Sequence, residues 1–279
     1  MALGKHWNSS RRGRPVIAGS DAELLEANIR MQRIGQRSRL VVSCIGHDHI
    51  HVAALCGPGE VGRMVQSVES SITQVNGLNP GFAPFYEKSI EDQRHLEMVA
   101  RYILRHSKKE ARPHDPDHLG NNGPELVGGR LLRLRRGGLI IPPSREVAAR
   151  FLPKITDEEI EKMLVGGRKR IELDKFGSAP AGLAGVELEE VLMDAAAAAI
   201  GLLDLDRRRA GVADARAAVL QLVETSPFIG SIQPVRMLGL DLSTLRRLRT
   251  REVWEPLAYA VRWQVEFRLT RRALAPMPR

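Results

Sequence analysis

Two short apolar runs with a brief turn between them constrain the fold of the first part of the chain. The run "RLVVSCI" (39–45) is apolar and rich in β-branched residues, and "HIHVAAL" (49–55) is similar, so each predicts a strand. The residues between Gly46 and Asp48 are well suited to turn the chain. After the second run, apolar side chains recur every three or four residues over 61–75, which predicts an amphipathic helix.

The remaining elements of this part complete an α+β pattern. Ser20 and Glu23 form a capping box that is expected to open a helix to about Gln36. A third strand is expected over 82–90, a helix over 91–107, and a short first strand within 1–18. This order is typical of an antiparallel sheet with helices packed on one face.

The histidines and the turn-forming residues suggest a division of the chain. All 8 histidines lie at or before His118. The stretch 112–129 is rich in Pro, Gly, Asn and Asp, which is typical of a linker. We therefore predict a first domain over 1–115, a linker over 116–155 and a helical domain over 156–279.

Composition favours a nucleic-acid partner. Hydrophobic residues make up 43% of the 279 residues, enough to build a packed core, and the net charge is +9, which suggests an anionic partner. The two cysteines, Cys44 and Cys56, are not spaced as a zinc site. No apolar run approaches the roughly 20 residues that span a bilayer, and no secretory signal is recognisable. We expect a cytoplasmic, nucleoid-associated protein that does not enter membranes.

Three histidines, His47, His49 and His51, fall within a few residues of one another. Side chains alternate along a strand, so His49 and His51 are expected on one face, with Ile50 and its neighbour Val52 on the other face in the core. Two imidazoles so arranged form half of a divalent metal site. The competing interpretation is a polar outer face that happens to be histidine. His47, in the turn, is expected to point elsewhere.

The helix predicted over 91–107 carries further candidates. Tyr102 and His106 are four residues apart and share a helix face, and His95 lies seven residues before Tyr102 on the same side. A tyrosine beside a histidine is more often structural than catalytic, so the pair alone leaves both interpretations open.

Taken together, "HDHIHVAALC" and "FAPFYEKSIEDQRHLEMVARYILRH" resemble the single-tyrosine HUH transposases, and most closely their REP-associated tyrosine transposase branch. The motif of that family is two histidines separated by one hydrophobic residue, here His49-Ile50-His51. The nucleophilic tyrosine of the family lies in a helix about 50 residues later, here at Tyr102. The resemblance covers roughly residues 12–109, and this chain lacks the Asn-Pro that commonly follows the tyrosine in relatives.

The resemblance implies a fold, a reaction and a cofactor. The fold would be a ferredoxin-like antiparallel sheet with helices. The protein would be a metal-dependent DNA transposase or endonuclease that nicks and rejoins single-stranded or hairpin DNA through a 5′-phosphotyrosine on Tyr102. The metal, Mg²⁺ or Mn²⁺, would be held by His49, His51 and His106, because relatives carry a further ligand one turn after the tyrosine.

The second part of the chain is predicted to be all-helical. Thr156 and Glu159 form another capping box, and helices are expected over 187–203 and 214–226. Residues 231–251 have the pattern of a helix-turn-helix with Gly239 in the turn. Its second helix carries the candidate residues for binding duplex DNA: Arg246, Arg247, Arg249 and Arg251.

This segment distantly resembles the C-terminal DNA-binding domain of the bacterial replication initiator, without the Arg-Asp-His-Thr loop of that domain. An Arg-rich solvated helix in an unrelated bundle is the alternative. For the whole chain, two further function classes stay open: a domesticated or inactive relative that only binds DNA, and a relaxase or rolling-circle HUH endonuclease. The last is disfavoured because such enzymes often carry a third histidine in the motif or paired tyrosines, although His47 speaks for it. The protein is expected to be a monomer or a homodimer.

Overall fold

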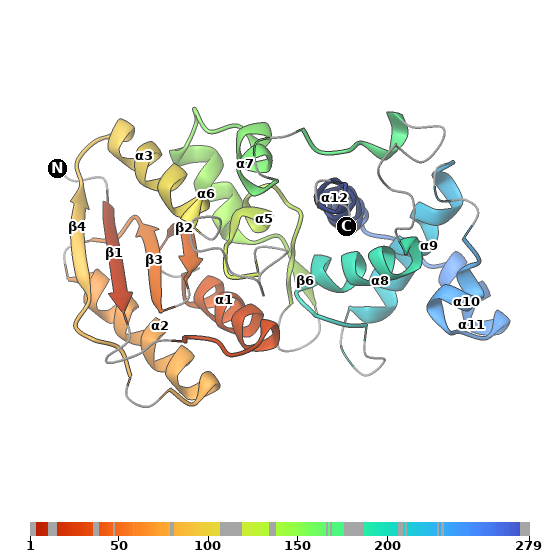
Figure 1. Cartoon of the computed structure of the whole chain (residues 1–279), viewed down its shortest axis with the longest axis horizontal. Coiled ribbons are helices and arrows are strands. Elements are labelled where there is room, and N and C mark those ends of the chain that lie inside the picture. Colours follow the sequence, from red (N-terminus) through yellow and green to blue (C-terminus); the bar gives the residue numbers. More distant parts are fainter. Residues whose placement is uncertain are drawn as a thin grey trace, which may run out of the picture. The chain divides into compact units, whose positions relative to one another are not determined.

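The chain forms two compact units (Figure 1). Unit 1 comprises residues 1–127 and 142–167, and unit 2 comprises 128–141 and 168–279. The computed structural model describes residues 4–10, 16–35, 39–46, 48–57, 59–78, 81–106, 119–133, 138–165, 167, 169–175, 187–205, 209, 211–227, 229 and 232–273.

Unit 1 is built on a four-stranded antiparallel sheet. Its first elements follow the ferredoxin-like order β-α-β-β-α-β, and the strands lie side by side in the order β2-β3-β1-β4. The bounds are β1 (Gly4–Ser10), α1 (Asp21–Gly35), β2 (Leu40–Ile45), β3 (His49–Ala54), α2 (Glu60–Asn76), β4 (Tyr86–Ile90) and, after the sheet, α3 (Gln93–Leu104). The predicted α+β class, the ferredoxin-like sheet and the short first strand are confirmed.

Helices cover both faces of this sheet, so the prediction of helices on one face only was wrong. Trp7, Ile50 and Val52 pack with α1 and α2 in one hydrophobic core. The opposite face receives α3, as Figure 1 shows. The physical reason is that β2 is buried along its whole length and β3 along nearly all of it, so both faces need cover.

Residues 119–127 lie against the outer edge of β2 instead of forming a linker. The backbone N–H of Ile45 donates to the Gly120 carbonyl (2.7 Å), and the backbone N–H of Asn122 donates to the Ser43 carbonyl (3.2 Å). Both asparagines of "GNNG", Asn121 and Asn122, are fully buried. The short helix α5 (Gly123–Leu126) follows, also buried. This segment therefore closes a sheet edge whose backbone groups would otherwise stay unpaired.

Two more helices from the predicted linker and helical domain belong to unit 1. These are α6 (Pro143–Phe151) and α7 (Asp157–Leu164). Thr156 caps α7 by accepting from the backbone of Glu159 (3.2 Å), as its capping box predicted. Glu159 in turn binds Arg101 of α3 through two hydrogen bonds of 2.6 and 3.2 Å. The compact units thus divide at other places than the predicted boundaries at 115 and 155.

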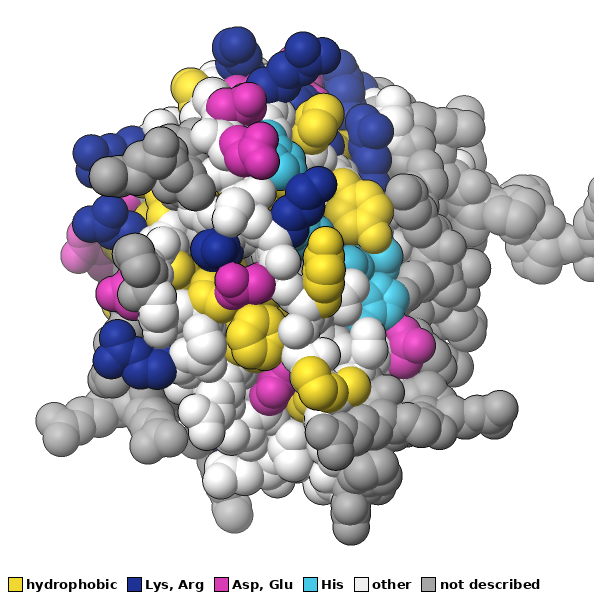
Figure 2. All heavy atoms as spheres, turned by 90° about the vertical axis from the view of Figure 1, so that its left-hand side faces the viewer, with side chains coloured by type: hydrophobic (Ala, Val, Ile, Leu, Met, Phe, Trp, Pro, Cys, Tyr) yellow, Lys and Arg dark blue, Asp and Glu magenta, His cyan; other side chains and the backbone are white. Residues whose placement is uncertain are grey.

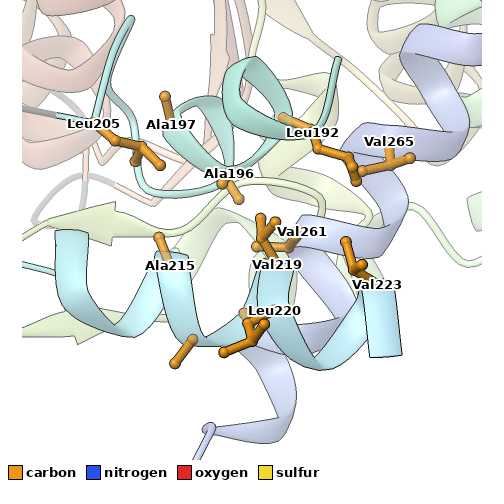
Figure 3. Close-up of a cluster of buried hydrophobic side chains, with 14 of the residues drawn as sticks. Leu192, Ala196, Ala197, Leu205, Ala215, Val219, Leu220, Val223, Val261 and Val265 are labelled. Carbon is orange, nitrogen blue, oxygen red and sulfur yellow. The ribbon is translucent and has the colours of Figure 1, made fainter. Parts of the chain in front are cut away.

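Unit 2 is mainly helical, with its core between α8, α9 and α12 (Figure 3). Its elements are β5 (Leu132–Arg133), β6 (Leu139–Ile140), a 3-10 turn (Leu173–Lys175), α8 (Leu188–Ala199), α9 (Val212–Thr225), α10 (Pro234–Leu238), α11 (Leu242–Arg249) and α12 (Glu255–Arg272). The paired strands β5 and β6 come from the predicted linker, whereas the elements described within 156–279 are all helical, as predicted. Within the described residues, no helix is long and apolar enough to span a bilayer.

The helix pair expected near residue 240 is present as local structure. Helix α10 ends at Leu238, Gly239 adopts a left-handed conformation (φ 58°), and α11 begins after Asp241. The Asp241 side chain accepts a hydrogen bond from the backbone of Thr244 (2.8 Å) and so caps α11. Leu245 and Leu248 pack into the core of unit 2. The turn and the anchored second helix thus follow the predicted pattern, whereas DNA binding by this pair stays a prediction.

The burial of Asn122 yields a stability prediction. Its side chain accepts from the backbone of Ser43 (2.9 Å) and donates to the Val41 carbonyl (3.4 Å). Asn122→Ala leaves both buried groups without these partners and is expected to lower the free energy of unfolding by about 2–4 kcal/mol. Chemical denaturation monitored by circular dichroism measures this change. Gln66→Ala, an exposed site on α2, is the control and should change stability by less than about 0.5 kcal/mol.

Candidate metal centre

Three histidines converge on the face of the sheet that α3 covers. The strand β3 contributes His49 and His51, and His106 follows the C-terminal end of α3. Each offers a ring nitrogen, and these three nitrogens all lie within 4.8 Å of one another. His51 and His106 are buried, and His49 is partly exposed. Three convergent imidazoles at this spacing fit one transition-metal ion, whose bonds to nitrogen are about 2.0–2.1 Å long in zinc sites.

The orientation of His49 supports this interpretation. Its Nδ1 lies 2.5 Å from Oδ1 of Asp48, and its Nε2 lies 2.6 Å from Nε2 of His106. When Nδ1–H donates to the carboxylate, neutral His49 keeps the lone pair on Nε2, directed toward His106. A histidine held by a carboxylate through its second nitrogen is the usual arrangement of a metal ligand. The residues present therefore fit a divalent ion.

Tyr102 lies at the rim of the cluster. Its ring centroid is 5.2 Å from that of His51 and 5.3 Å from that of His106. The side chain is 39% exposed, whereas these two histidines are 3% and 7% exposed. Tyr102 and His106 thus lie side by side, as their spacing of four residues predicted. A partly exposed tyrosine side chain thus stands beside buried metal-ligand candidates.

The first strand adds two residues that the sequence analysis did not identify. Pairing with β3 sets Asn8 opposite His51, and His6 stacks on His51 with centroids 5.6 Å apart. The Asn8 amide nitrogen lies 3.4 Å from Nδ1 of His51. Burial lowers the pKa of His6, and the charges of His95 and Lys88 lower it further. The signal that was missed is the alternation in "GKHWNSS", which sends His6 and Asn8 to the face opposite Trp7.

Several contacts fix α3, the helix that carries Tyr102. At its start, Asp92 accepts from the backbone of His95 (2.7 Å). At its end, the buried side chain of Asn121 donates to the Leu104 carbonyl (3.0 Å). Between them, Arg101 binds α7. The helix is thereby held at both ends and in the middle, which sets the position of the tyrosine over the sheet.

The other predicted site residues lie elsewhere or outside the described part of the chain. His47 lies outside the described residues. Tyr86, the other tyrosine of unit 1, is 69% exposed at the start of the edge strand β4. All four arginines proposed to bind duplex DNA are exposed in unit 2.

Two of those arginines are engaged within unit 2. Arg249 pairs with Glu224 and Arg251 pairs with Asp214, each at 2.6 Å. Arg247 donates to the Thr244 hydroxyl of its own helix (3.1 Å). The ion pairs reduce the net positive charge that this end of α11 presents to a partner.

Comparison with known proteins finds little similarity. No model of a protein family matches the chain, and no curated protein matches it significantly. Among solved structures, that of a REP-associated tyrosine transposase bound to a REP hairpin is similar to part of this chain. The sequences are 15% identical, the match covers 44% of this chain and 78% of the other, and the TM-score is 0.35.

The geometry of the cluster predicts how metal binding changes on mutation. His51→Ala and His106→Ala each remove a ligand and should weaken Mn²⁺ binding by more than about tenfold, because even removing a ligand's hydrogen-bond partner costs about 10- to 100-fold. Asp48→Asn removes the hydrogen-bond partner of His49 and should weaken Mn²⁺ binding by about 10- to 100-fold. Isothermal titration calorimetry with manganese chloride measures these affinities. His95→Ala, on the same helix but outside the cluster, is the control, and an equal loss there would contradict the assignment.

Proposed function

We propose that unit 1 cuts and rejoins a DNA strand by transesterification, with Tyr102 as the nucleophile and a divalent metal ion held by His49, His51 and His106. The observation that carries this proposal is the partly exposed Tyr102 ring 5.2 Å from the buried ring of His51. A nucleophile must be reachable by a phosphate, and a metal ligand is best shielded from water. These two requirements match the exposures of the two side chains.

The reaction needs no external energy source. The Tyr102 hydroxyl loses its proton, and its oxygen forms a bond to phosphorus while the bond from phosphorus to the 3′ oxygen breaks; the leaving 3′ oxygen takes up a proton. The 5′ attachment follows from the sequence resemblance. A 3′-hydroxyl then attacks the phosphotyrosine, and Tyr102 leaves and regains its proton. One phosphodiester is exchanged for another, so joining requires no nucleotide cofactor.

The chain's own residues hold the parts of this site in place. When bound, a divalent ion supplies charge neutralisation at the phosphate. Asp48 orients His49, and His6 and Asn8 contact His51, so the ligand rings are held before any ion enters. Three imidazoles favour a transition metal such as Mn²⁺ over Mg²⁺, which prefers oxygen ligands. A DNA substrate would place the protein in the cytoplasm with the nucleoid.

Unit 2 is proposed to hold duplex DNA near its α10–α11 helix pair. The supporting observation is the exposed side chains of Arg246 and Arg247 on a capped helix that Leu245 and Leu248 anchor. Arg249 and Arg251 are expected to contribute less, because binding phosphate requires them to give up their ion pairs. An Arg-rich helix without a DNA role remains the competing interpretation.

The nucleophile has a direct test. Tyr102→Phe removes one oxygen atom and should abolish the covalent protein–DNA adduct, with DNA affinity lowered by no more than about tenfold, because a net hydrogen bond is worth only about 0.5–1.5 kcal/mol. A denaturing gel with a labelled hairpin oligonucleotide and Mn²⁺ detects the adduct. Tyr86→Phe is the matched control and should form adduct normally. DNA binding without any adduct in the unmodified protein would indicate an inactive relative instead.

The duplex-binding proposal predicts a change in salt dependence. Neutralising Arg246 and Arg247 together should weaken binding to a long duplex and reduce the log–log salt slope by about 0.9 for each phosphate that the protein no longer neutralises. Fluorescence anisotropy across a salt series measures the slope, and adduct formation should be unchanged. Lys169→Gln combined with Lys175→Gln removes two exposed charges of unit 2 outside the helix pair and serves as the control for a reduced charge alone. An unchanged slope in the double arginine variant rejects the DNA role of α11.

A further inference from the structure

The exposed large hydrophobic side chains of unit 1 are concentrated around the histidine cluster. Among the described residues of this unit, all of them lie on α3, on β4 or just before β4. They are Phe85 (36% exposed), Tyr86 (69%), Met98 (55%) and Tyr102 (39%). Figure 2 shows hydrophobic and histidine side chains exposed on this side of the molecule, with Lys and Arg side chains around them. Exposed hydrophobic side chains gathered in this way mark a binding surface.

The sheet register places Tyr86 in line with the cluster. Asn8 of β1 pairs with His51 on one side and with Tyr86 on the other. Directly paired residues of neighbouring strands project from the same face, so Tyr86 and His51 share the face that carries the site. Two strand spacings separate them, about 10 Å. Tyr86 therefore lies where a nucleotide next to a phosphate at Tyr102 would pass.

A positive charge accompanies the aromatic ring. Lys88 pairs with His6 and so projects from the same face as Tyr86, and it is exposed. By contrast, Glu87 projects from the opposite face, where it pairs with Lys5 (3.1 Å). The site face of β4 therefore combines an aromatic ring with a cation, and its neighbouring acid is turned away.

We propose that this face of β4 is a subsite for an unpaired nucleotide of the substrate strand, in which the base stacks on Tyr86 and Lys88 contacts a phosphate. The inference rests on the function proposed above and adds a position of single-strand recognition to it. A duplex cannot use this subsite, because its bases are already stacked on their neighbours and their faces are closed. Stacking on an aromatic ring tolerates any base, so the subsite selects unpaired DNA and not a sequence.

A binding experiment separates the two contacts. The full chain carrying Tyr102→Phe, which cannot form an adduct, is titrated onto a fluorescent oligothymidine and onto an abasic oligonucleotide of equal length. Adding Tyr86→Ala should weaken binding to oligothymidine by about tenfold and leave abasic binding unchanged. Tyr86→Phe retains the ring and should bind as before. Lys88→Gln should weaken both equally and reduce the salt slope by about 0.7 for single strands.

The outcomes distinguish this inference from its alternatives. Tyr259→Ala, a tyrosine of unit 2 that is 39% exposed, is the matched control and should not change affinity. The subsite is overturned if Tyr86→Ala leaves the affinity for oligothymidine the same as in the Tyr102→Phe parent. It is also overturned if the affinity falls equally for oligothymidine and the abasic oligonucleotide. A change in oligomeric state of the Tyr86→Ala variant, measured by light scattering, also overturns the subsite, because β4 would then bind a second copy of the chain. A base-dependent loss of binding, combined with no adduct from the chain that retains Tyr102, keeps the subsite and rejects the catalytic proposal.

Discussion

The register of β3 between its two neighbours decides what each of its side chains can do. Pairing with β1 and β2 turns Ile50 and Val52 into the core beneath α1 and α2, and turns His49 and His51 toward α3. A slip by one residue would exchange the two faces and bury both imidazoles among aliphatic side chains. Because the core residues strongly disfavour that slip, the hydrophobic effect that stabilises unit 1 also positions the candidate ligands.

The second half of the site depends on a buried polar network. The segment 119–127 pairs with the edge of β2 through its backbone, and Asn121 also reaches the end of α3 at the Leu104 carbonyl. Asn28 of α1 donates to Glu125 (3.3 Å) and to the Asn121 carbonyl (3.4 Å). A chain of hydrogen bonds thus connects α1, on one face of the sheet, to α3, on the other face. Buried polar groups are costly unless they are satisfied, so this network tolerates few alternative positions of α3.

Local patterns in the sequence were sufficient to predict the strands of unit 1, the shared face of His49 and His51, and the pairing of Tyr102 with His106. Each depends only on the period of a strand or a helix. They could not show that Asn121 and Asn122 are buried, because "GNNGPE" has the composition of a loop and acquires its role only against the edge of β2. His6 was missed for a related reason: it reaches His51 only because β1 lies between β3 and β4. Tyr86 has the pattern of any strand residue, and its exposure follows from the edge position of β4.

The composition of the cluster affects how strongly it can attract a phosphate. Within the described residues, the three candidate ligands are all imidazoles, and the nearest acid, Asp48, contacts His49 from behind. Neutral ligands leave the charge of a bound divalent ion undiminished, whereas carboxylate ligands would cancel much of it. The interaction of such an ion with a phosphate oxygen is also stronger beside buried groups than in water. An ion held by imidazole ligands, with Lys88 at the edge of the site, can therefore attract a nucleic-acid backbone at close range, and the +9 charge of the chain acts at longer range.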